Sequence, residues 1–317
     1  MRFLNPKTDY AFKKIFGSES SKDILISFLN AILDLTSEYV IAEVTIIDPY
    51  LAPKIEGMKD TYLDVRVRDR RGRSYIIEMQ VLNVEGFEKR VLYNACKAYV
   101  NQLGKGDHYH ILTEVVAVTI TDFEMFPDLA NVVSRFRLRA DENPLICHQD
   151  LELVFAELPK FTKPESDLST TLDRWFYFLR TAGDLTVIPQ SLAIEPAIVK
   201  ALELANRAAW TEEELDDLEK REMWIVEQRH ILERSRTAEQ RGRVAGMAAG
   251  KAEGRAEGRA EGRAEMLLLL LRRRDKTLPV GIEDRVRAAS IEQLGEWSER
   301  YADGKSLTEI FDSEPVD

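Results

Sequence analysis

Residues 63–81 alternate apolar and polar side chains on both sides of a short turn. The first half runs Leu63, Asp64, Val65, Arg66, Val67 and Arg68. Residues 69–72 are typical of a turn, and 75–81 form a second run of largely apolar residues. Because successive side chains of a strand point to opposite faces, the pattern predicts a β-hairpin with Asp64 on the face opposite to the aliphatic residues. This hairpin restricts the fold to classes that contain a sheet.

The segments around the hairpin predict an α/β domain. Apolar residues at helical spacing indicate two helices within 9–34 and a third over 87–103. Residues 40–47 are β-branched, and 115–121 form the nearly continuous apolar run of a strand buried on both faces. A further hairpin is expected from 132–139 and 150–157, and helices from 167–182, 190–206 and 211–240. We therefore expect an α/β fold followed by an all-helical C-terminal extension.

Two carboxylates are expected to meet across the hairpin. Glu78 and Gln80 share one face of the second strand, because they are two residues apart. If the strands pair about the turn, Asp64 and Glu78 lie nearly opposite each other, about 5 Å apart. Such carboxylates repel, and a shared divalent cation relieves the repulsion; oxygen ligands favour Mg²⁺, with Mn²⁺ as an alternative. The solvated face of an ordinary hairpin is the other interpretation of this spacing.

Several short motifs stand in a characteristic order along the chain. They are Asp9-Tyr-Ala-Phe-Lys-Lys-Ile-Phe-Gly, Phe28-Leu-Asn-Ala-Ile-Leu, Lys59 ahead of Leu63-Asp64-Val65, Ile77-Glu78-Met79-Gln80, Arg90-Val-Leu-Tyr93, Tyr99, Gln102-Leu103 and Gly106 through Tyr109. Together they resemble the recombination-promoting nuclease and transposase family of the PD-(D/E)XK nuclease superfamily, from about residue 3 to about residue 180. The resemblance implies a restriction-endonuclease-like core, a mixed sheet flanked by helices, that cleaves DNA with Mg²⁺.

The resemblance also implies which residues form the site. Asp64 matches the metal-binding Asp that follows an upstream Lys, here Lys59, and Glu78 matches the second metal ligand. The carbonyl of Met79 is a further candidate ligand. Asp9 matches an N-terminal Asp that could lie near the site, although an N-cap of the first helix is an equal interpretation.

Gln80 departs from the superfamily pattern, which usually has Lys at this position. That Lys would orient the attacking water and stabilise charge on the phosphate. A neutral amide can orient water but supplies no positive charge, so Lys59 or Lys97 is a candidate for the missing cation. We expect the catalytic set to be Asp64, Glu78, Gln80 and Lys59.

The charge of the chain is unevenly distributed. It has 44 basic and 55 acidic residues, and a net charge of −11 disfavours a nucleic-acid partner on its own. Residues 1–150, however, contain 19 basic and 22 acidic residues, a net charge of only −3. Six arginines are expected to contact DNA phosphates: Arg66, Arg68, Arg70, Arg71 and Arg73 around the turn, and Arg90 on the next helix. An ordinary charged turn is the alternative.

Glycine recurs every fourth residue at 242, 246, 250, 254, 258 and 262. One interpretation is a flexible linker, because each Gly costs a helix about 1 kcal/mol relative to Ala. The other is a helix whose glycine ridge lets a second helix approach closely. In a parallel pair the Arg flank of one helix faces the Glu flank of the other, so self-association through 242–265 is expected to be parallel.

These features predict four segments: a nuclease-like domain over 1–185, a helical connector over 186–241, the glycine repeat over 242–265 and a small helical module over 266–317. The last resembles a C-terminal domain of unknown function that follows such nuclease-like proteins. The resemblance implies an Mg²⁺-dependent DNA endonuclease of the recombination-promoting type. The alternatives are a catalytically weak DNA-binding or regulatory protein on the same fold, and a helical oligomerisation scaffold.

The few cysteines and the short apolar runs of the sequence indicate the cellular compartment. Two cysteines, Cys96 and Cys147, cannot form a disulfide framework, and the N-terminus has no apolar signal region. The longest apolar run is far shorter than the roughly 20 residues that a membrane span needs. We expect a cytoplasmic protein without a membrane partner.

Overall fold

The computed structural model describes residues 2–52, 59–143, 147–275 and 277–311. The chain forms two compact units, Met1–Leu232 and Glu233–Asp317. The boundary differs from the expected one at residue 185, because the helices after that point pack into the core of the first unit.

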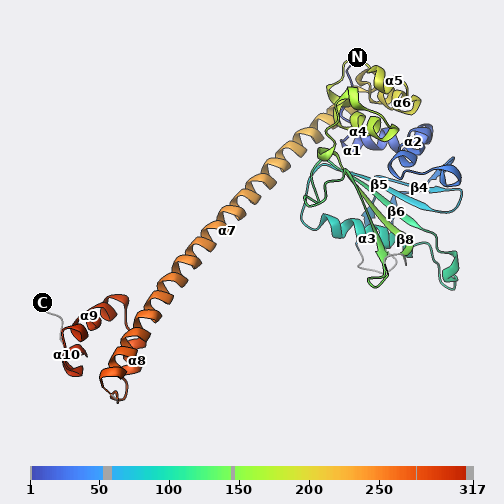
Figure 1. Cartoon of the computed structure of the whole chain (residues 1–317). Coiled ribbons are helices and arrows are strands. Elements are labelled where there is room, and N and C mark those ends of the chain that lie inside the picture. Colours follow the sequence, from blue (N-terminus) through green and yellow to red (C-terminus); the bar gives the residue numbers. More distant parts are fainter. Residues whose placement is uncertain (1, 53–58, 144–146, 276, 312–317) are drawn as a thin grey trace. The chain divides into compact units, whose positions relative to one another are not determined.

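A mixed six-stranded sheet is the centre of the first unit (Figure 1). Its strands, in spatial order, are β1 (Val44–Ile46), β4 (Val65–Asp69), β5 (Ser74–Gln80), β6 (Val115–Thr121), β8 (Cys147–Glu157) and β7 (Val133–Arg139). The central pairs β5–β6 and β6–β8 are parallel, and the outer pairs are antiparallel. A small separate ribbon pairs β2 (Tyr50–Leu51) with β3 (Thr61–Tyr62). The expected fold class and the second hairpin are confirmed.

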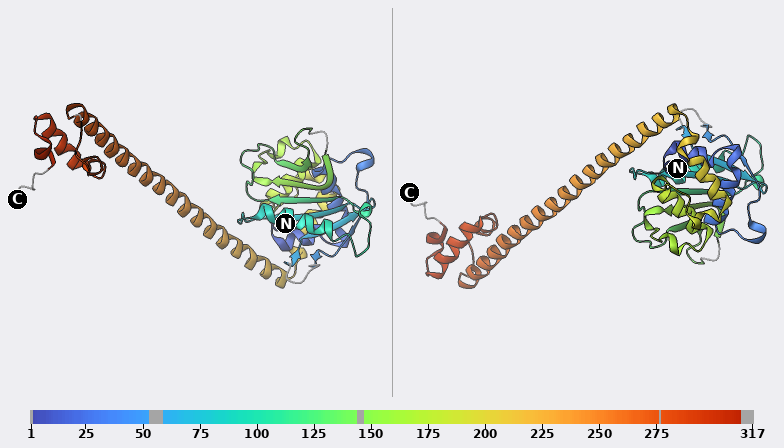
Figure 2. Two further views of the ribbon diagram at one scale, coloured as in Figure 1. Left: turned by 90° about the horizontal axis from the view of Figure 1, so that it is seen from below. Right: turned by 90° about the horizontal axis from the view of Figure 1, so that it is seen from above.

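Helices cover both faces of this sheet, as the three views show (Figures 1 and 2). On one face lie α1 (Asp9–Phe16), α2 (Lys22–Ile32), α4 (Thr171–Thr181), α5 (Gln190–Ala193) and α6 (Pro196–Ala205). On the other face lies α3 (Phe87–Val100), which packs on Ile76, Ala117 and Phe155. The alternation of β5 divides its side chains between these two cores, with Ile77 toward α1 and α2 and Ile76 toward α3.

The hairpin of β4 and β5 has the expected register. Val65 pairs with Ile77 and Arg68 with Ser74, and Asp64 and Glu78 each lie one residue beyond the Val65–Ile77 pair. The expectation that Leu63 shares a face with Val65 is wrong, because the chain bends at Asp64 before β4 begins. The Leu63 amide donates to the Pro49 carbonyl, and its side chain joins the core under α3.

The segment expected as a connector is part of the first unit up to Leu232. Buried Leu192, Ile198 and Leu202 belong to the core that α1 and α2 share with the sheet. The long helix α7 (Glu212–Arg274) also begins here, and Leu218 packs with Trp210 beside α1. Its first turns, from Glu212 to Leu232, therefore belong with the first unit.

The second unit contains the glycine repeat and a small helical module. Of the two interpretations of the repeat, the structure has the helix, since residues 242–265 lie within α7. The end of α7 forms a separate core with α8 (Ile282–Arg287), α9 (Ile291–Ala302) and α10 (Leu307–Phe311). Leu267 and Leu271 are buried there, beside the edge-on rings of Trp297 and Phe311. Within the described residues, none of these helices combines the length and apolar character that a membrane span requires.

Candidate active site

A pocket of about 1000 Å³ lies in the first unit, where the end of β5 meets α1, α3 and the start of α7. Its lining includes six residues that the sequence predicted for the site or its DNA contacts: Asp9, Lys59, Asp64, Glu78, Gln80 and Arg90. The other five residues are far from Asp9 in the sequence, so the fold assembles the site from separate elements. The predicted carboxylates therefore face one shared space.

Asp64 lies at the bend before β4 and is fixed by two contacts. Its Oδ2 accepts a hydrogen bond from the Met79 amide at 2.9 Å, and Oδ1 lies 3.3 Å from the Lys13 ammonium. Burial raises the pKa of Asp64 to about 7, and the charges of Asp9 and Glu78 add to the rise, while the Met79 amide and Lys13 oppose it. The carboxylate is thus costly to ionise without a further cation.

Glu78 lies on β5 and points toward α3. Its Oε1 accepts a hydrogen bond from the Asn94 amide nitrogen at 3.1 Å, and both side chains are buried. Burial raises the pKa of Glu78, although the charges of Arg90 and Lys13 and the Asn94 hydrogen bond lower it in part. Two adjacent carboxylates with raised pKa values are a favourable environment for a divalent cation.

Gln80 is tied to Arg90 of α3. Its Oε1 accepts a hydrogen bond from the Arg90 guanidinium at 2.7 Å, and its amide nitrogen donates to the Leu82 carbonyl at 2.8 Å. The guanidinium also lies over the Phe87 ring, 4.9 Å from its centre. An amide keeps one further donor and one further lone pair, so Gln80 can still contact water. The structure thus places the positive charge of Arg90 beside the Gln80 side chain.

Asp9 lies at the first residue of α1 and lines the same pocket. The N-cap is Thr8, so the interpretation of Asp9 as the cap is wrong. Asp9 forms ion pairs of 2.7 Å with Lys13 and with Arg221 of α7. Burial raises the pKa of Asp9, but Lys13, together with hydrogen bonds to Asp64 and Arg221, outweighs burial and the net shift is downward. Asp9 therefore remains ionised and connects α1 to α7.

The donors fit a hard divalent cation of the Mg²⁺ type. Asp64, at the bend before β4, and Glu78, on β5, supply carboxylate oxygens, which is the ligand chemistry that Mg²⁺ prefers. Among the described residues no group of three or more His, Cys, Asp and Glu side chains converges on a metal position. Two protein carboxylates leave coordination positions for water and phosphate, as Mg²⁺ sites on phosphate substrates commonly have.

The two lysines named as candidate cations have different positions. Lys59 is exposed and lines the pocket. Lys97 is buried in α3, and its ammonium donates to the Lys59 carbonyl at 2.5 Å and to the Thr61 hydroxyl at 3.3 Å. Lys97 therefore fixes the backbone that leads to β3, whereas Lys59 can reach a substrate.

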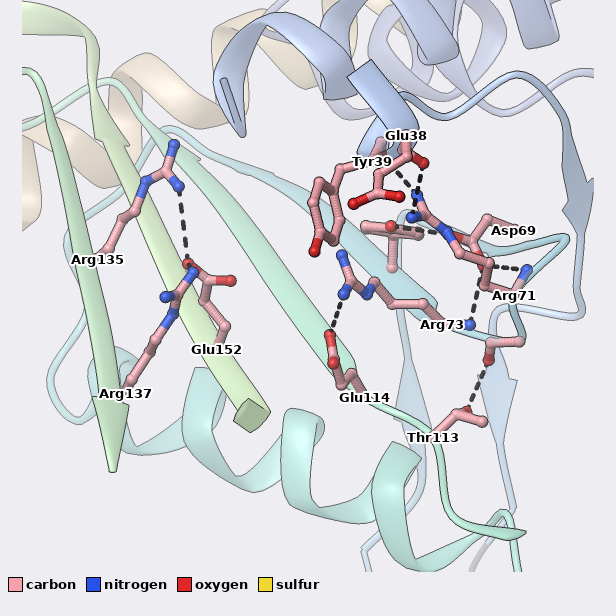
Figure 3. A network of polar contacts seen from close by, with 12 residues as sticks. Glu38, Tyr39, Asp69, Arg71, Arg73, Thr113, Glu114, Arg135, Arg137 and Glu152 are labelled. Carbon is pink, nitrogen blue, oxygen red and sulfur yellow. Dashed lines mark hydrogen bonds and ion pairs between the residues drawn. The ribbon is translucent and has the colours of Figure 1, made fainter. Parts of the chain in front are cut away.

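The turn arginines lie at the far end of the hairpin from the carboxylates. Gly72 is six residues from Glu78 along the chain, which is about 20 Å in an extended strand. Arg71 donates to the carbonyls of Glu38 and Tyr39, and Arg73 forms an ion pair of 2.6 Å with Glu114 (Figure 3). The expected position of these arginines beside the metal site is wrong, because the turn and the site are at opposite ends of the same strands.

The other three hairpin arginines differ in their surroundings. Arg70 pairs with Glu43 and is largely exposed. Arg66 is half-buried, two residues from Asp64, and its guanidinium reaches the Asp48 carbonyl at 3.5 Å. Arg68 is exposed on the same strand. Of the five, Arg66 is nearest in sequence to the carboxylates; phosphate binding by these arginines stays a prediction.

Several residues of the site were not predicted from the sequence. Lys13 and Asn94 contact the two carboxylates, and Arg221 and Trp224 bring α7 to the pocket. The spacing of Asp9 and Lys13, one helical turn apart, was a visible signal for the first of these. No local signal identifies Arg221, which is 212 residues from its partner Asp9.

The family described as PD-(D/E)XK nuclease family transposase matches residues 6–235 of the chain. The match ends close to Leu232, where the first compact unit ends. No curated protein and no solved structure matches the chain. The matched region contains the whole sheet and every residue of the pocket, including those of α7.

Proposed function

The chain belongs to the PD-(D/E)XK nuclease family of transposases, and we propose that it is a metal-dependent endonuclease that hydrolyses DNA phosphodiester bonds at Asp64 and Glu78. The observation that supports this proposal most is that the two carboxylates line one pocket. Burial raises the pKa of both. A recombination-promoting role follows from the family resemblance and belongs to the same proposal.

Asp64 and Glu78 would hold the metal, with the carbonyl of Met79, the residue after Glu78, as a further ligand. Mg²⁺ or Mn²⁺ supplies Lewis-acid chemistry that polarises the phosphate and lowers the pKa of a bound water. The chain's own residues hold the carboxylates in place: the Met79 amide fixes Asp64, and Asn94 fixes Glu78. Such outer contacts orient ligands and tune their affinity for metal.

Gln80 and Arg90 complete the proposed site. In hydrolysis a water gives up one proton to solvent as its oxygen forms a bond to phosphorus, the bond to the leaving oxygen breaks, and that oxygen takes a proton from solvent. Negative charge grows on the phosphate oxygens, and the Arg90 guanidinium, held by Gln80, is available to stabilise it. Gln80 would position the water with its remaining donor or lone pair.

Nicking of supercoiled plasmid tests the proposal. The purified full-length protein is expected to nick DNA with Mg²⁺ or Mn²⁺ and to stop when EDTA is added. Asp64→Asn and Glu78→Gln are expected to lose nearly all activity, because each removes one ligand charge. Glu88→Gln, an exposed carboxylate of α3 outside the pocket, is the matched control and is expected to cut normally. If Asp64→Asn nicks as fast as the unchanged protein, the site assignment is wrong.

A DNA-binding or regulatory protein with weak catalysis is the second candidate. Gln80 favours it, because the residue lacks the Lys charge and both ends of its amide already bond within the chain. This candidate predicts retarded DNA mobility without nicking in Mg²⁺, and binding that Asp64→Asn leaves intact.

A further inference from the structure

Three aromatic side chains at the pocket are exposed. Tyr62 of β3 is 74% exposed, Trp224 of α7 is 55% exposed and Tyr93 of α3 is 37% exposed, and all three line the space that contains Asp64 and Glu78. They come from three separate elements. Large aromatic rings left in water are costly for a folded chain, and their concentration at one pocket indicates a ligand with flat apolar surfaces.

The start of α7 is fixed against the pocket by ion pairs. Arg221 pairs with Asp9 at 2.7 Å, and Arg229 pairs with Asp122 at 3.2 Å. Asp122 also accepts from Lys7 at 2.9 Å, so two cations hold the same carboxylate. Residues 221, 225 and 229 repeat at the four-residue spacing of one helix face. Trp224 therefore lies on a helix that ion pairs hold against the pocket.

The charges of the pocket suit a polyanion once a metal is bound. Its described lining has five basic side chains, Lys7, Lys59, Lys89, Arg90 and Arg221, and five acidic ones, a difference of zero. A divalent cation on the carboxylates would give the pocket a net charge of +2. Cations together with exposed aromatic rings are the combination that binds the phosphates and bases of single-stranded nucleic acid.

We propose that the substrate of this pocket is unpaired DNA, whose bases stack on Trp224, Tyr93 and Tyr62 while a phosphate lies between Arg90 and the carboxylates. This inference rests on the proposed nuclease function and narrows its substrate. Ring faces stack at lowest cost on bases released from a duplex, because paired bases already stack on their neighbours and must first be unstacked. The pocket, which has a volume of about 1000 Å³ and is lined by residues of α3 and α7, accommodates a short run of nucleotides.

Cleavage and binding of one labelled sequence in three forms test the inference: a single strand, a perfect duplex, and a duplex with a central unpaired bubble. With Mg²⁺ the full-length protein is expected to cut the single strand at least tenfold faster than the duplex, and to cut the third form within its bubble. By fluorescence anisotropy in EDTA, Trp224→Ala is expected to weaken single-strand affinity about tenfold. Trp224→Phe is expected to restore most of that affinity, because it keeps a ring.

Met223→Ala is the matched control, since Met223 is the exposed neighbour on α7 and does not line the pocket. It is expected to bind all three forms normally. Equal cleavage of single strand and duplex overturns the inference while leaving the nuclease proposal intact. The same holds if Trp224→Ala leaves the ratio of single-strand affinity to duplex affinity unchanged. If none of the three forms is cut, the nuclease proposal fails, and the affinity ratio in EDTA still decides whether the pocket prefers unpaired DNA.

Discussion

The Asp64 carboxylate accepts a hydrogen bond from the backbone amide of Met79 at 2.9 Å. This bond links the bend before β4 to the strand that carries Glu78, and both carboxylates line the same pocket. The position of Asp64 is therefore set by a backbone amide as well as by the Lys13 side chain. A site built in this way is preorganised for a ligand that needs two oxygens at a fixed separation.

Asn94→Ala is expected to raise the Mg²⁺ concentration needed for half-maximal nicking by about tenfold. Asn94 donates the hydrogen bond that orients the buried Glu78 carboxylate, and its loss leaves a buried oxygen without that donor. Titration of nicking rate against Mg²⁺ measures the effect. Asn101→Ala is the control, because Asn101 follows the same helix but bonds to the Ala52 carbonyl instead. An unchanged Mg²⁺ requirement in Asn94→Ala would show that this contact does not support the metal.

Arg90→Ala is expected to lower the kcat of cleavage about a hundredfold, because it removes the cation that Gln80 holds beside the carboxylates. Gln80→Lys in the same protein is expected to recover part of that loss, since it returns a positive charge to the superfamily position. With Arg90 present, Gln80→Lys instead places two cations together and is expected to be unfavourable. A double-mutant cycle on kcat measures the coupling. Independent, additive effects of the two changes would contradict the proposed shared role.

The hairpin shows how far local pattern determines the structure. Alternation of side chains and the turn at 69–72 were sufficient to predict β4, β5 and their antiparallel pairing. The same strands explain the failed expectation for Arg71 and Arg73. A strand extends about 3.3 Å per residue, so charges at the turn are remote from residues at the other end.

Long-range contacts account for what the sequence did not predict. The ion pair of Asp9 with Arg221 joins helices separated by most of the first unit's length, and no local spacing indicates it. Gln80 was identified as a departure, but its partner Arg90 is ten residues away on another element and became visible only in the fold. The boundary between the helical connector and the nuclease-like domain could not be predicted from composition either. The burial of Ile198 and Leu202 depends on α1 and α2, which are distant in sequence.

Asp173 is expected to stabilise the first unit above acidic pH. Lys163 donates to both of its oxygens at 2.8 and 2.9 Å, and Ser169 and Thr170 amides donate at 3.1 Å. Burial raises the pKa of Asp173, but these donors outweigh it and lower the pKa to about 2, from 3.8. A lowered folded-state pKa stabilises the fold above the unfolded value, by about 2 kcal/mol here, and this contribution disappears as pH falls from 3.8 toward 2.

Urea unfolding of Asp173→Asn and the unchanged protein measures this contribution. The difference in unfolding free energy is expected to be largest at neutral pH and to shrink as pH falls through this interval. Asp167→Asn, an exposed carboxylate in the preceding segment, is expected to show little difference at any pH. If the difference in unfolding free energy between Asp173→Asn and the unchanged protein stays constant with pH, ionisation of Asp173 does not stabilise the unit.

The glycine ridge of α7 is expected to pair with a second copy of the chain in parallel. At each glycine from Gly242 to Gly262, a Cβ atom would meet nothing within 4 Å, so the ridge is open to a partner. Each glycine weakens the lone helix by about 1 kcal/mol relative to Ala, and close packing of two ridges would offset that cost. Sedimentation is expected to find an oligomer that dissociates when residues 242–265 are deleted.

Substitutions at Gly250 and Gly254 separate packing from helix propensity. Changing both to Ala keeps the ridge small and is expected to preserve the oligomer, whereas changing both to Leu is expected to disrupt it; circular dichroism should show higher helicity in both. Orientation is tested by Gly246→Cys in a protein lacking Cys96 and Cys147. Position 246 meets itself only in a parallel pair, so a disulfide-linked dimer is expected under mild oxidation. An oligomer that survives the Leu changes forms through another surface, and one that resists crosslinking at 246 is not a parallel pair in register.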